Sequence, residues 1–230
     1  MNEITNRLKA IRNAIKDAAQ SAGRNPDEIL LVGVSKRQSA AKAMAAVHAG
    51  VTILGENYIQ EAVEKIETLK DLEASWHFIG HLQTNKARFA VQHFDLIHTV
   101  DSIKLAREID KQAQKIKKIQ KILIQINISQ ESSKSGARAD DALALVRGVS
   151  LLKNVAITGL MGMPPFFDDP EQARPFFREL AQIRSKIEDA KIPNVLMDHL
   201  SMGMSGDFKA AIEEGSTMVR IGTAIFGARS

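Results

Sequence analysis

Short apolar runs alternate with amphipathic, helix-like stretches along almost the whole chain, and this alternation limits the fold more than any other feature. The eight apolar runs are Ile29–Lys36, Val51–Gly55, Trp76–Gly80, Leu96–Val100, Ile122–Ile128, Val155–Met161, Val195–Leu200 and Met218–Ile221. The helix-like stretches between them are Ala40–Ala49, Tyr58–Leu72, Asn85–Gln92, Ile103–Ile119, Asp140–Leu152, Glu171–Ala190 and Asp207–Glu214. Such alternation predicts an α/β protein with parallel strands and crossover helices. Eight strands in 230 residues fit a closed (β/α)8 TIM-type barrel, with a doubly wound open sheet as the alternative.

The chain is predicted to form one domain over residues 1–230. No stretch rich in Gly, Ser or Pro separates it into two halves, and one longer loop is expected at Met163–Pro170. An additional helix is predicted before the first strand, because apolar residues recur at helical spacing at Ile4, Leu8, Ile11 and Ile15.

Composition excludes several kinds of site and partner. The sequence has no cysteine, which rules out disulfides, thiolate metal sites and cysteine nucleophiles. The N terminus lacks an apolar signal core and no apolar run approaches the roughly 20 residues of a membrane span, so a cytoplasmic protein without membrane contact is expected. Much of the net charge of +4 lies in Lys111–Lys121, without interleaved aromatic residues. This favours a solvated helix end, with Lys117 and Lys118 exposed, over a nucleic-acid surface.

Lys36 ends the first apolar run, and the carboxyl ends of parallel strands are where such folds place their ligand sites. Because desolvation disfavours an ammonium group, a lysine there can supply a neutral amine that attacks an aldehyde. The simpler interpretation is a lysine that marks the strand end and reaches solvent. Other residues expected at the same mouth are Glu56, Asn57, His81 and Asn127.

Small residues follow the seventh and eighth strands, where barrels of this kind often bind phosphate. Ser201 and Ser205 lie in one such segment, and Gly222 and Thr223 lie in the other. Their hydroxyl and backbone N–H groups are expected to converge on an anion. Together with Lys36, they predict a phosphorylated aldehyde held at both ends.

Arg220 lies at the tip of the last predicted strand, next to the first strand if the barrel closes. It either pairs with a carboxylate such as Glu213 or Asp198, or faces the ring nitrogen of a pyridine cofactor. Because a guanidinium does not give up its proton, the second arrangement keeps that nitrogen unprotonated and disfavours carbanion chemistry.

His77 and His81 have the spacing of a helical zinc motif, but they lie in a strand-like run without a nearby carboxylate. Hydrogen bonding at the strand end is expected for them, and no metal site is predicted. Packing around a pocket floor is expected for Met161, Met163, Met202 and Met204.

Six longer segments occur together and in a fixed order: Gly33–Lys36, Gly55–Tyr58, Trp76–Lys86, Gly159–Met163, Ser201–Ser205 and Arg220–Gly227. They resemble the pyridoxal phosphate homeostasis protein family (YggS/PROSC type), and the resemblance covers essentially the whole chain. It implies a fold-type III barrel similar to the N-terminal domain of alanine racemase, with pyridoxal 5′-phosphate (PLP) as the cofactor.

The resemblance also implies the cofactor-binding residues Lys36, Asn57, Ser201, Ser205, Arg220, Gly222 and Thr223. Lys36 would carry the cofactor as an internal aldimine, Arg220 would face the pyridine nitrogen, and Asn57 would lie beside the ring. The other four would contact the phosphate.

The implied function is PLP binding and vitamin B6 homeostasis in the cell, without robust catalysis. Racemisation needs two acid/base groups on opposite faces of the substrate carbon, and alanine racemase takes the second, a tyrosine, from another domain. This sequence ends soon after the last predicted strand, and its one tyrosine is Tyr58. The alternatives are a PLP-dependent amino-acid racemase or lyase, and a class I aldolase-like barrel that acts on a sugar phosphate. A monomer is expected, with PLP-dependent apoenzymes as transient partners.

Overall fold

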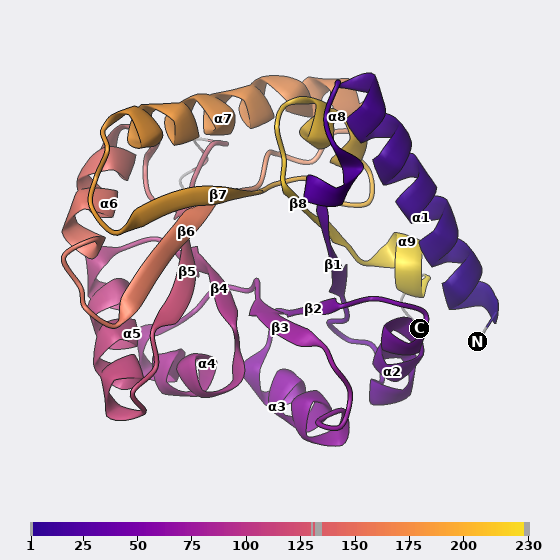
Figure 1. Ribbon diagram of the computed structural model, residues 1–230, viewed down its shortest axis with the longest axis horizontal. Helices are drawn as coiled ribbons and strands as arrows, with labels where there is room; N and C mark the ends of the chain where they lie inside the picture. The colour runs from indigo at the N-terminus through magenta and orange to yellow at the C-terminus, as the bar shows by residue number, and fades with distance from the viewer. Residues whose placement is uncertain (1, 130, 132–134, 228–230) are drawn as a thin grey trace.

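Eight parallel strands form a closed barrel in the computed structural model, which describes residues 2–129, 131 and 135–227 (Figure 1). The strands are β1 (Leu30–Val34), β2 (Ile53–Glu56), β3 (Ser75–Phe78), β4 (Leu96–Val100), β5 (Gln120–Ile126), β6 (Val155–Gly162), β7 (Val195–Ser201) and β8 (Met218–Ile221). They follow one another around the barrel in chain order, and β1 pairs with β8 to close it. Closure confirms the predicted barrel and excludes the open sheet.

Helices surround the strands on the outside (Figure 1). The crossover helices are α2 (Ala40–His48), α3 (Ile59–Thr68), α4 (Ala87–His93), α5 (Ile103–Lys115), α6 (Ala142–Val149), α7 (Arg174–Asp189) and α8 (Phe208–Glu213). Short 3-10 turns precede α4, α6 and α7, at η2 (Thr84–Lys86), η3 (Ala139–Asp141) and η4 (Pro170–Ala173). Each predicted helical stretch therefore contains a helix, and each of these helices is shorter than the sequence pattern suggested.

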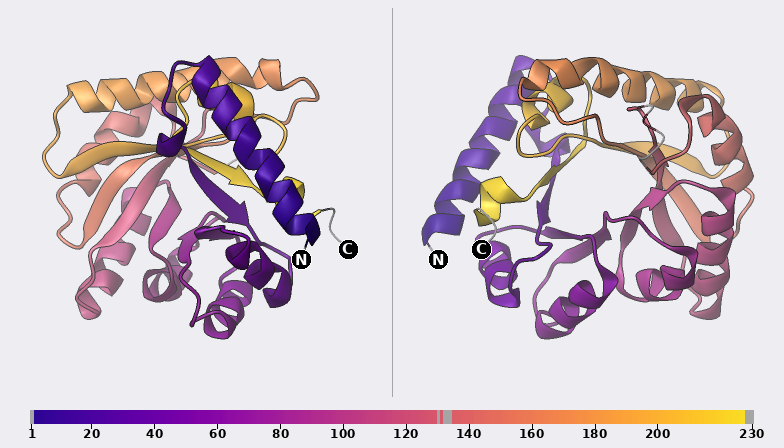
Figure 2. Two further views of the ribbon diagram at one scale, coloured as in Figure 1. Left: turned by 45° about the vertical axis from the view of Figure 1, so that its right-hand side comes forward. Right: turned by 180° about the vertical axis from the view of Figure 1, so that it is seen from behind.

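The predicted N-terminal helix is α1 (Asn2–Ser21), which is joined to β1 through η1 (Pro26–Glu28). It packs beside α8 and beside a short last helix, α9 (Thr223–Phe226), which was not predicted (Figure 2). Its buried face carries Leu8, Ile11 and Ile15, as the helical spacing indicated. No helix in the described part of the chain is long and apolar enough to cross a membrane.

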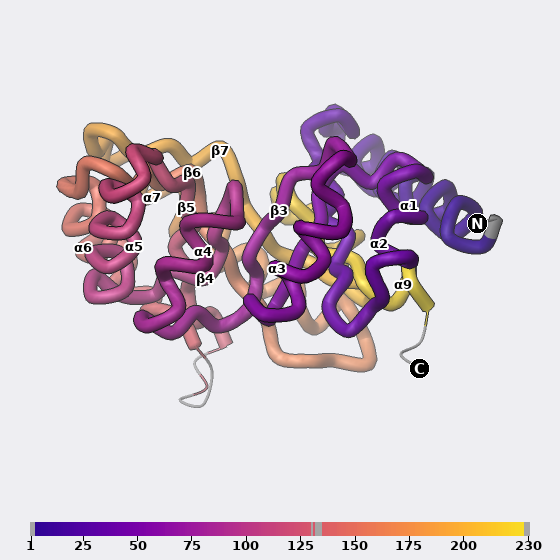
Figure 3. Tube along the Cα trace, turned by 90° about the horizontal axis from the view of Figure 1, so that it is seen from below, coloured from indigo at the N-terminus to yellow at the C-terminus, as the bar shows by residue number. Residues whose placement is uncertain are grey.

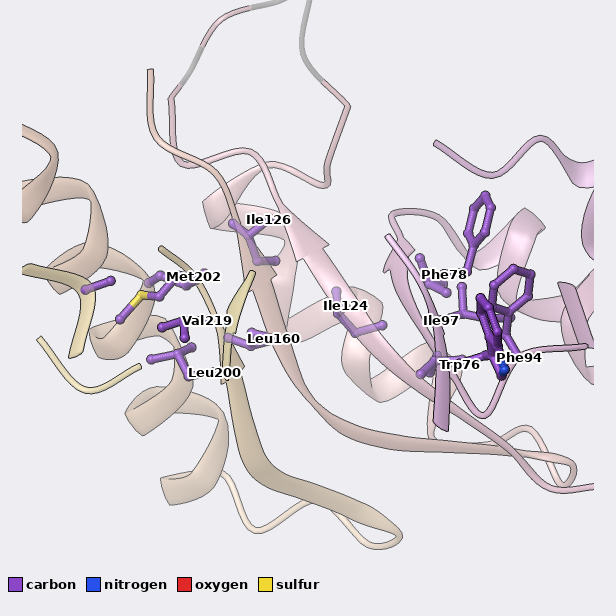
Figure 4. Close-up of a cluster of buried hydrophobic side chains, with 14 of the residues drawn as sticks. Trp76, Phe78, Phe94, Ile97, Ile124, Ile126, Leu160, Leu200, Met202 and Val219 are labelled. Carbon is purple, nitrogen blue, oxygen red and sulfur yellow. The ribbon is translucent and has the colours of Figure 1, made fainter. Parts of the chain in front are cut away.

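The larger hydrophobic core lies between the strands and the helices. Figure 4 shows part of it, including Phe78 and Phe94, whose ring centroids lie 5.2 Å apart. A smaller cluster is formed by Val32, Ile53, Leu96, Leu123, Met161 and Met218. These residues occupy alternate strand positions, so they face the interior of the barrel. The same alternation directs the strand-end residues Lys36, Asn57, Arg220 and Gly222 toward the barrel axis.

Candidate functional site

A cavity of about 420 Å³ opens at the carboxyl ends of the strands. Six of the seven predicted site residues line it: Lys36, Asn57, Ser205, Arg220, Gly222 and Thr223. The loop after β6, which projects from one end of the barrel in Figure 3, contributes Met163, Phe166 and Phe167 to the lining. A cavity of this size at this end of a barrel suits a small-molecule ligand.

A tight turn after β1 presents Lys36 to the cavity. The Ser35 N–H donates to the Gly55 carbonyl oxygen at 3.0 Å, and the Gln38 N–H donates to the Ser35 carbonyl oxygen at 3.0 Å. Arg37 then adopts a left-handed conformation with φ of 57°. The chain therefore turns away directly after Lys36, which leaves the half-buried lysine side chain at the cavity wall.

A buried ion pair supports this turn from the helix side. The Lys65 ammonium on α3 lies 2.7 Å from Glu56 Oε1 and 2.6 Å from the Ser35 carbonyl oxygen. The Ser35 hydroxyl also donates to Glu56 Oε1, at 2.7 Å. Burial raises the pKa of Glu56, and the hydrogen bonds from Lys65 and Ser35 oppose that rise. The prediction that Glu56 faces the mouth is wrong, because strand alternation turns Asn57 inward and Glu56 toward α3.

Asn57 is held close to the end of β3. A Cβ atom at Gly80 would lie 2.2 Å from the Asn57 carbonyl oxygen, so only glycine permits this approach. Asn57 Oδ1 is shielded from solvent and has no hydrogen-bond partner among the described residues. An acceptor of this kind at a cavity wall points to a ligand that supplies the missing donor or a polar contact.

Arg220 is buried at the floor of the cavity. Its Nη1 donates to Ser201 Oγ at 2.6 Å, and its Nη2 donates to the Gly162 carbonyl oxygen at 3.1 Å. Burial lowers the pKa of Arg220 to about 10, and the negative charge of Asp207 partly offsets this effect. Of the two arrangements considered for Arg220, the ion pair with Glu213 or Asp198 is not formed. Glu213 pairs with Arg174 at 2.7 Å, and Asp198 is exposed.

Ser201 does not reach the cavity with the other six residues. It is the last residue of β7, it is fully buried, and its hydroxyl is engaged with Arg220. Its second partner is His98 Nδ1 at 3.0 Å, and His98 Nε2 lies 3.0 Å from His77 Nδ1. Burial lowers the pKa of His77 to about 4 and the pKa of His98 well below its ordinary value.

Both histidines that the sequence singled out form hydrogen bonds at or just after the end of β3, as predicted, but they face different surroundings. His81 is exposed and lies within hydrogen-bond distance of the Ser135 hydroxyl, at 3.2 Å, whereas His77 lies inside the barrel. His98 was not predicted. Strand alternation from Leu96 was the signal that could have placed it inward. Across the described residues, no group of three His, Cys, Asp or Glu side chains could hold a metal ion.

A second turn carries Ser205 into the cavity. Gly203 has φ of 92°, and a Cβ atom there would lie 2.6 Å from the Cβ of Ala211 on α8. Asp207 Oδ1 accepts from the Met204 N–H at 2.6 Å, which fixes the turn. Burial raises the pKa of Asp207, opposed by the Met204 N–H and by Arg220.

The charges and donors of the lining fit a small anion that bears an aldehyde. Lys36 and Arg220 are the basic side chains of the lining, and Asp207 is the one carboxylate among the lining residues. The hydroxyls of Ser205 and Thr223 add donors at the ends of two neighbouring segments. The orphaned Asn57 Oδ1 lies at the same wall, so the residues present can hold such a group.

Comparison with known proteins agrees with this geometry. Residues 7–230 match the family model described as the N-terminal domain of alanine racemase. A pyridoxal phosphate homeostasis protein of Aquifex aeolicus is 42% identical over 223 residues, which cover 97% of each chain. The chain belongs to the pyridoxal phosphate homeostasis protein family. The Escherichia coli K12 member of the family is 42% identical over 234 residues, or 100% of this chain and 98% of that protein.

A solved structure similar to this chain is that of PipY of Synechococcus elongatus with PLP bound. It is 35% identical to this chain, with a TM-score of 0.85, and the match covers 97% of this chain and 100% of PipY. The family and the fold inferred from the sequence are therefore confirmed.

Proposed function

We propose that the protein binds PLP in this cavity and takes part in vitamin B6 homeostasis in the cell, without robust catalysis. The observation that carries the proposal is the meeting of Lys36 and Arg220 in one cavity beside the unpartnered Asn57 Oδ1. The names of the relatives and the PLP-bound structure of PipY support it.

Lys36 provides the covalent attachment in this proposal. Its amine would be the group that bonds to the aldehyde carbon of the ligand, with release of water. Arg220 would face the ring nitrogen from the cavity floor, and Asn57 would lie beside the ring. When bound, the pyridine ring supplies an electron sink, which a protonated ring nitrogen strengthens. Because the guanidinium of Arg220 only donates, it keeps that nitrogen unprotonated and weakens the sink.

The phosphate group is assigned to the ends of β7 and β8. Ser205, Gly222 and Thr223 line this part of the cavity, where their hydroxyl and backbone N–H groups can donate to phosphate oxygens. Ser201 is left out of this set, since its hydroxyl is buried against Arg220 and His98.

The position of Tyr58 favours binding over racemisation. The tyrosine is 48% exposed, is absent from the cavity lining, and has the Arg37 guanidinium 5.9 Å from its ring centroid. Among the lining residues, the ionisable side chains are those of Lys36, Arg220 and Asp207. Asp207 accepts from the Met204 N–H in its own turn, so this lining offers no tyrosine as second acid/base.

The proposal also includes the domain organisation, the location and the partners of the protein. Residues 1–230 act as one cytoplasmic, monomeric unit, and PLP passes transiently to PLP-dependent apoenzymes. Neither nucleic acid nor membrane takes part. The open cavity mouth, walled by the loop after β6, suits transfer of a ligand better than protection of a carbanion.

The absorption spectrum with added PLP tests the proposal. Wild type is expected to gain a visible band that Lys36→Ala lacks and that Lys42→Ala, altered on α2, retains. Borohydride reduction followed by peptide mass analysis should then find the pyridoxyl group on Lys36. A protein that stays colourless with PLP, or that is trapped by sugar phosphates instead, would contradict it. Fast turnover of single L-amino acids would favour the racemase or lyase.

A further inference from the structure

A row of buried polar side chains runs from Arg220 across the inside of the barrel. Arg220 is the one member of this row that has a role in the proposed function. We infer that Ser201, His98 and His77 act as a positioning relay that fixes the guanidinium of Arg220 beneath the cavity. The inference deepens the proposed function and rests on it where it concerns the cofactor.

The relay joins two pairs of consecutive strands, β3 with β4 and β7 with β8, that come from separate parts of the chain. Arg220 on β8 contacts Ser201 on β7 at 2.6 Å, and Ser201 contacts His98 on β4 at 3.0 Å. His98 contacts His77 on β3 at 3.0 Å. Because β4 and β7 are not neighbours in the barrel, the contact between Ser201 and His98 crosses its interior. All four residues are at most 6% exposed, so solvent does not compete with these hydrogen bonds.

The chemistry of the groups fixes the direction of each hydrogen bond. A guanidinium only donates, so Ser201 Oγ accepts from Arg220. The Ser201 hydrogen is then directed to His98 Nδ1, its other partner among the described residues. His98 consequently carries its proton on Nε2 and donates to His77 Nδ1. The reverse arrangement would leave the buried Ser201 hydrogen without an acceptor, which is unfavourable.

The relay holds a cation without neutralising it. Burial favours the neutral form of both histidines, and the other charged or titratable groups near them are Asp95, Lys121 and His199. A carboxylate in place of Ser201 would cancel the charge of Arg220, whereas a neutral hydroxyl leaves it directed at the cavity. The relay therefore fixes the position of the guanidinium and adds no negative charge that would neutralise it.

Nitrogen NMR of the histidines tests the relay in the protein without cofactor. The chain has six histidines. The variants His77→Asn and His98→Asn identify the Nδ1 and Nε2 resonances that belong to these two residues. Wild type is expected to show a protonated Nε2 and a hydrogen-bonded, unprotonated Nδ1 on His98. In Ser201→Ala the Nδ1 resonance should move to that of an unbonded nitrogen. Ser216→Ala removes an equally buried hydroxyl that donates to the Met202 carbonyl oxygen, and it should leave His98 unchanged. A proton on His98 Nδ1 in wild type, or equal effects of the two variants, would overturn the relay.

Release of PLP provides the second readout. Loss of a hydrogen bond to a charged group corresponds to a change in affinity of about tenfold or more, so Ser201→Ala should release PLP about tenfold faster than Ser216→Ala. If wild type forms no Lys36-dependent band, the proposed function fails while the NMR result still decides the relay. If wild type forms the band and both variants release PLP at equal rates, the relay fails while the function stands.

Discussion

The Lys65 ammonium lies 2.7 Å from the Glu56 carboxylate, and both side chains are buried behind the turn that carries Lys36. Removing the cation alone leaves a buried carboxylate without its partner, which typically destabilises a protein by about 3–5 kcal/mol. Lys65→Met is therefore expected to lower the free energy of unfolding by about that amount, measured by urea denaturation at pH 7. The double variant Lys65→Met/Glu56→Gln should recover much of the loss, because the fully buried carboxylate of Glu56 is removed as well. The other carboxylate that contacts Lys65, that of Glu61 at 2.6 Å, is 27% exposed and keeps access to solvent.

The control for this variant is Lys42→Met. Lys42 lies on α2, where its ammonium donates to the Gln38 side chain at 3.0 Å. Its replacement should change stability by no more than about 0.5 kcal/mol. A Lys65→Met variant as stable as Lys42→Met would show that the buried pair does not hold the turn.

Gly80 determines where Asn57 can lie. A methyl group at this position would come within 2.2 Å of the Asn57 carbonyl oxygen, so Gly80→Ala must displace backbone at the cavity wall. We expect a loss of about 1–3 kcal/mol in unfolding free energy, together with weaker PLP binding. Gly148→Ala in α6 is the matched control, since its new Cβ would meet Ile103 at an ordinary 3.5 Å. That variant should be neutral or more stable by up to about 1 kcal/mol. Equal behaviour of the two variants would contradict the role given to Gly80.

Sequence periodicity was sufficient to predict the strands and their parallel arrangement, because apolar runs and amphipathic stretches repeat on their own scales. Periodicity alone did not exclude an open sheet, and closure was decided by the pairing of β1 with β8 in the structure. Helix ends were less predictable. The stretch predicted to continue to Ile119 ends at Lys115, and Lys117 takes a left-handed conformation with φ of 53°. Lys118, expected to be solvated, donates to the carbonyl oxygens of Val91 and Phe94, at the end of α4. A tertiary contact between two helices thus ends α5, and it has no local signal in the sequence.

The residues of the site also differ in how far the sequence alone could place them. Lys36, Asn57 and Arg220 could be placed at one mouth, because parallel strands in a barrel bring their carboxyl ends together. The inward direction of Ser201 and His98 depends on the register of each strand, and a shift of one residue reverses it. Their engagement with Arg220 therefore became visible only in the structure.

Phe166 and Phe167 are neighbours in the loop after β6, but they are expected to differ in their effects on PLP release and on stability. Phe166 is 86% exposed at the cavity mouth, whereas Phe167 packs against the core with its ring centroid 5.7 Å from that of Phe176. Phe166→Ser should leave stability within about 0.5 kcal/mol while it speeds PLP release, since one wall of the mouth is lost. Phe167→Ser should lower stability by about 1–3 kcal/mol. Thermal unfolding and release kinetics separate the two effects, and a stability loss in Phe166→Ser would contradict this division.

Because of its buried histidines, the free energy of unfolding of the protein is expected to fall at acidic pH. The pKa of His77 lies at about 4 in the folded protein, against an ordinary value of 6.5, and that of His98 is also lowered. Between these values the unfolded chain takes up a proton that the folded chain does not, so the free energy of unfolding falls as the pH falls from 6.5 toward 4. The difference corresponds to about 3 kcal/mol for His77 alone. Glu56 acts in the opposite sense, because its raised pKa makes the folded carboxyl take up its proton first.

Replacing both histidines isolates this effect. In His77→Phe/His98→Leu, the free energy of unfolding should change much less between pH 7 and pH 4.5 than in wild type, as measured by urea denaturation at several pH values. Comparing slopes removes any uniform loss caused by repacking the barrel interior. His48→Asn, which alters an exposed histidine on α2, should keep the wild-type slope. If the double variant keeps it too, the two buried histidines are not held neutral. Arg220 would then share the interior with additional positive charge, and the neutral relay beneath the cavity could not exist.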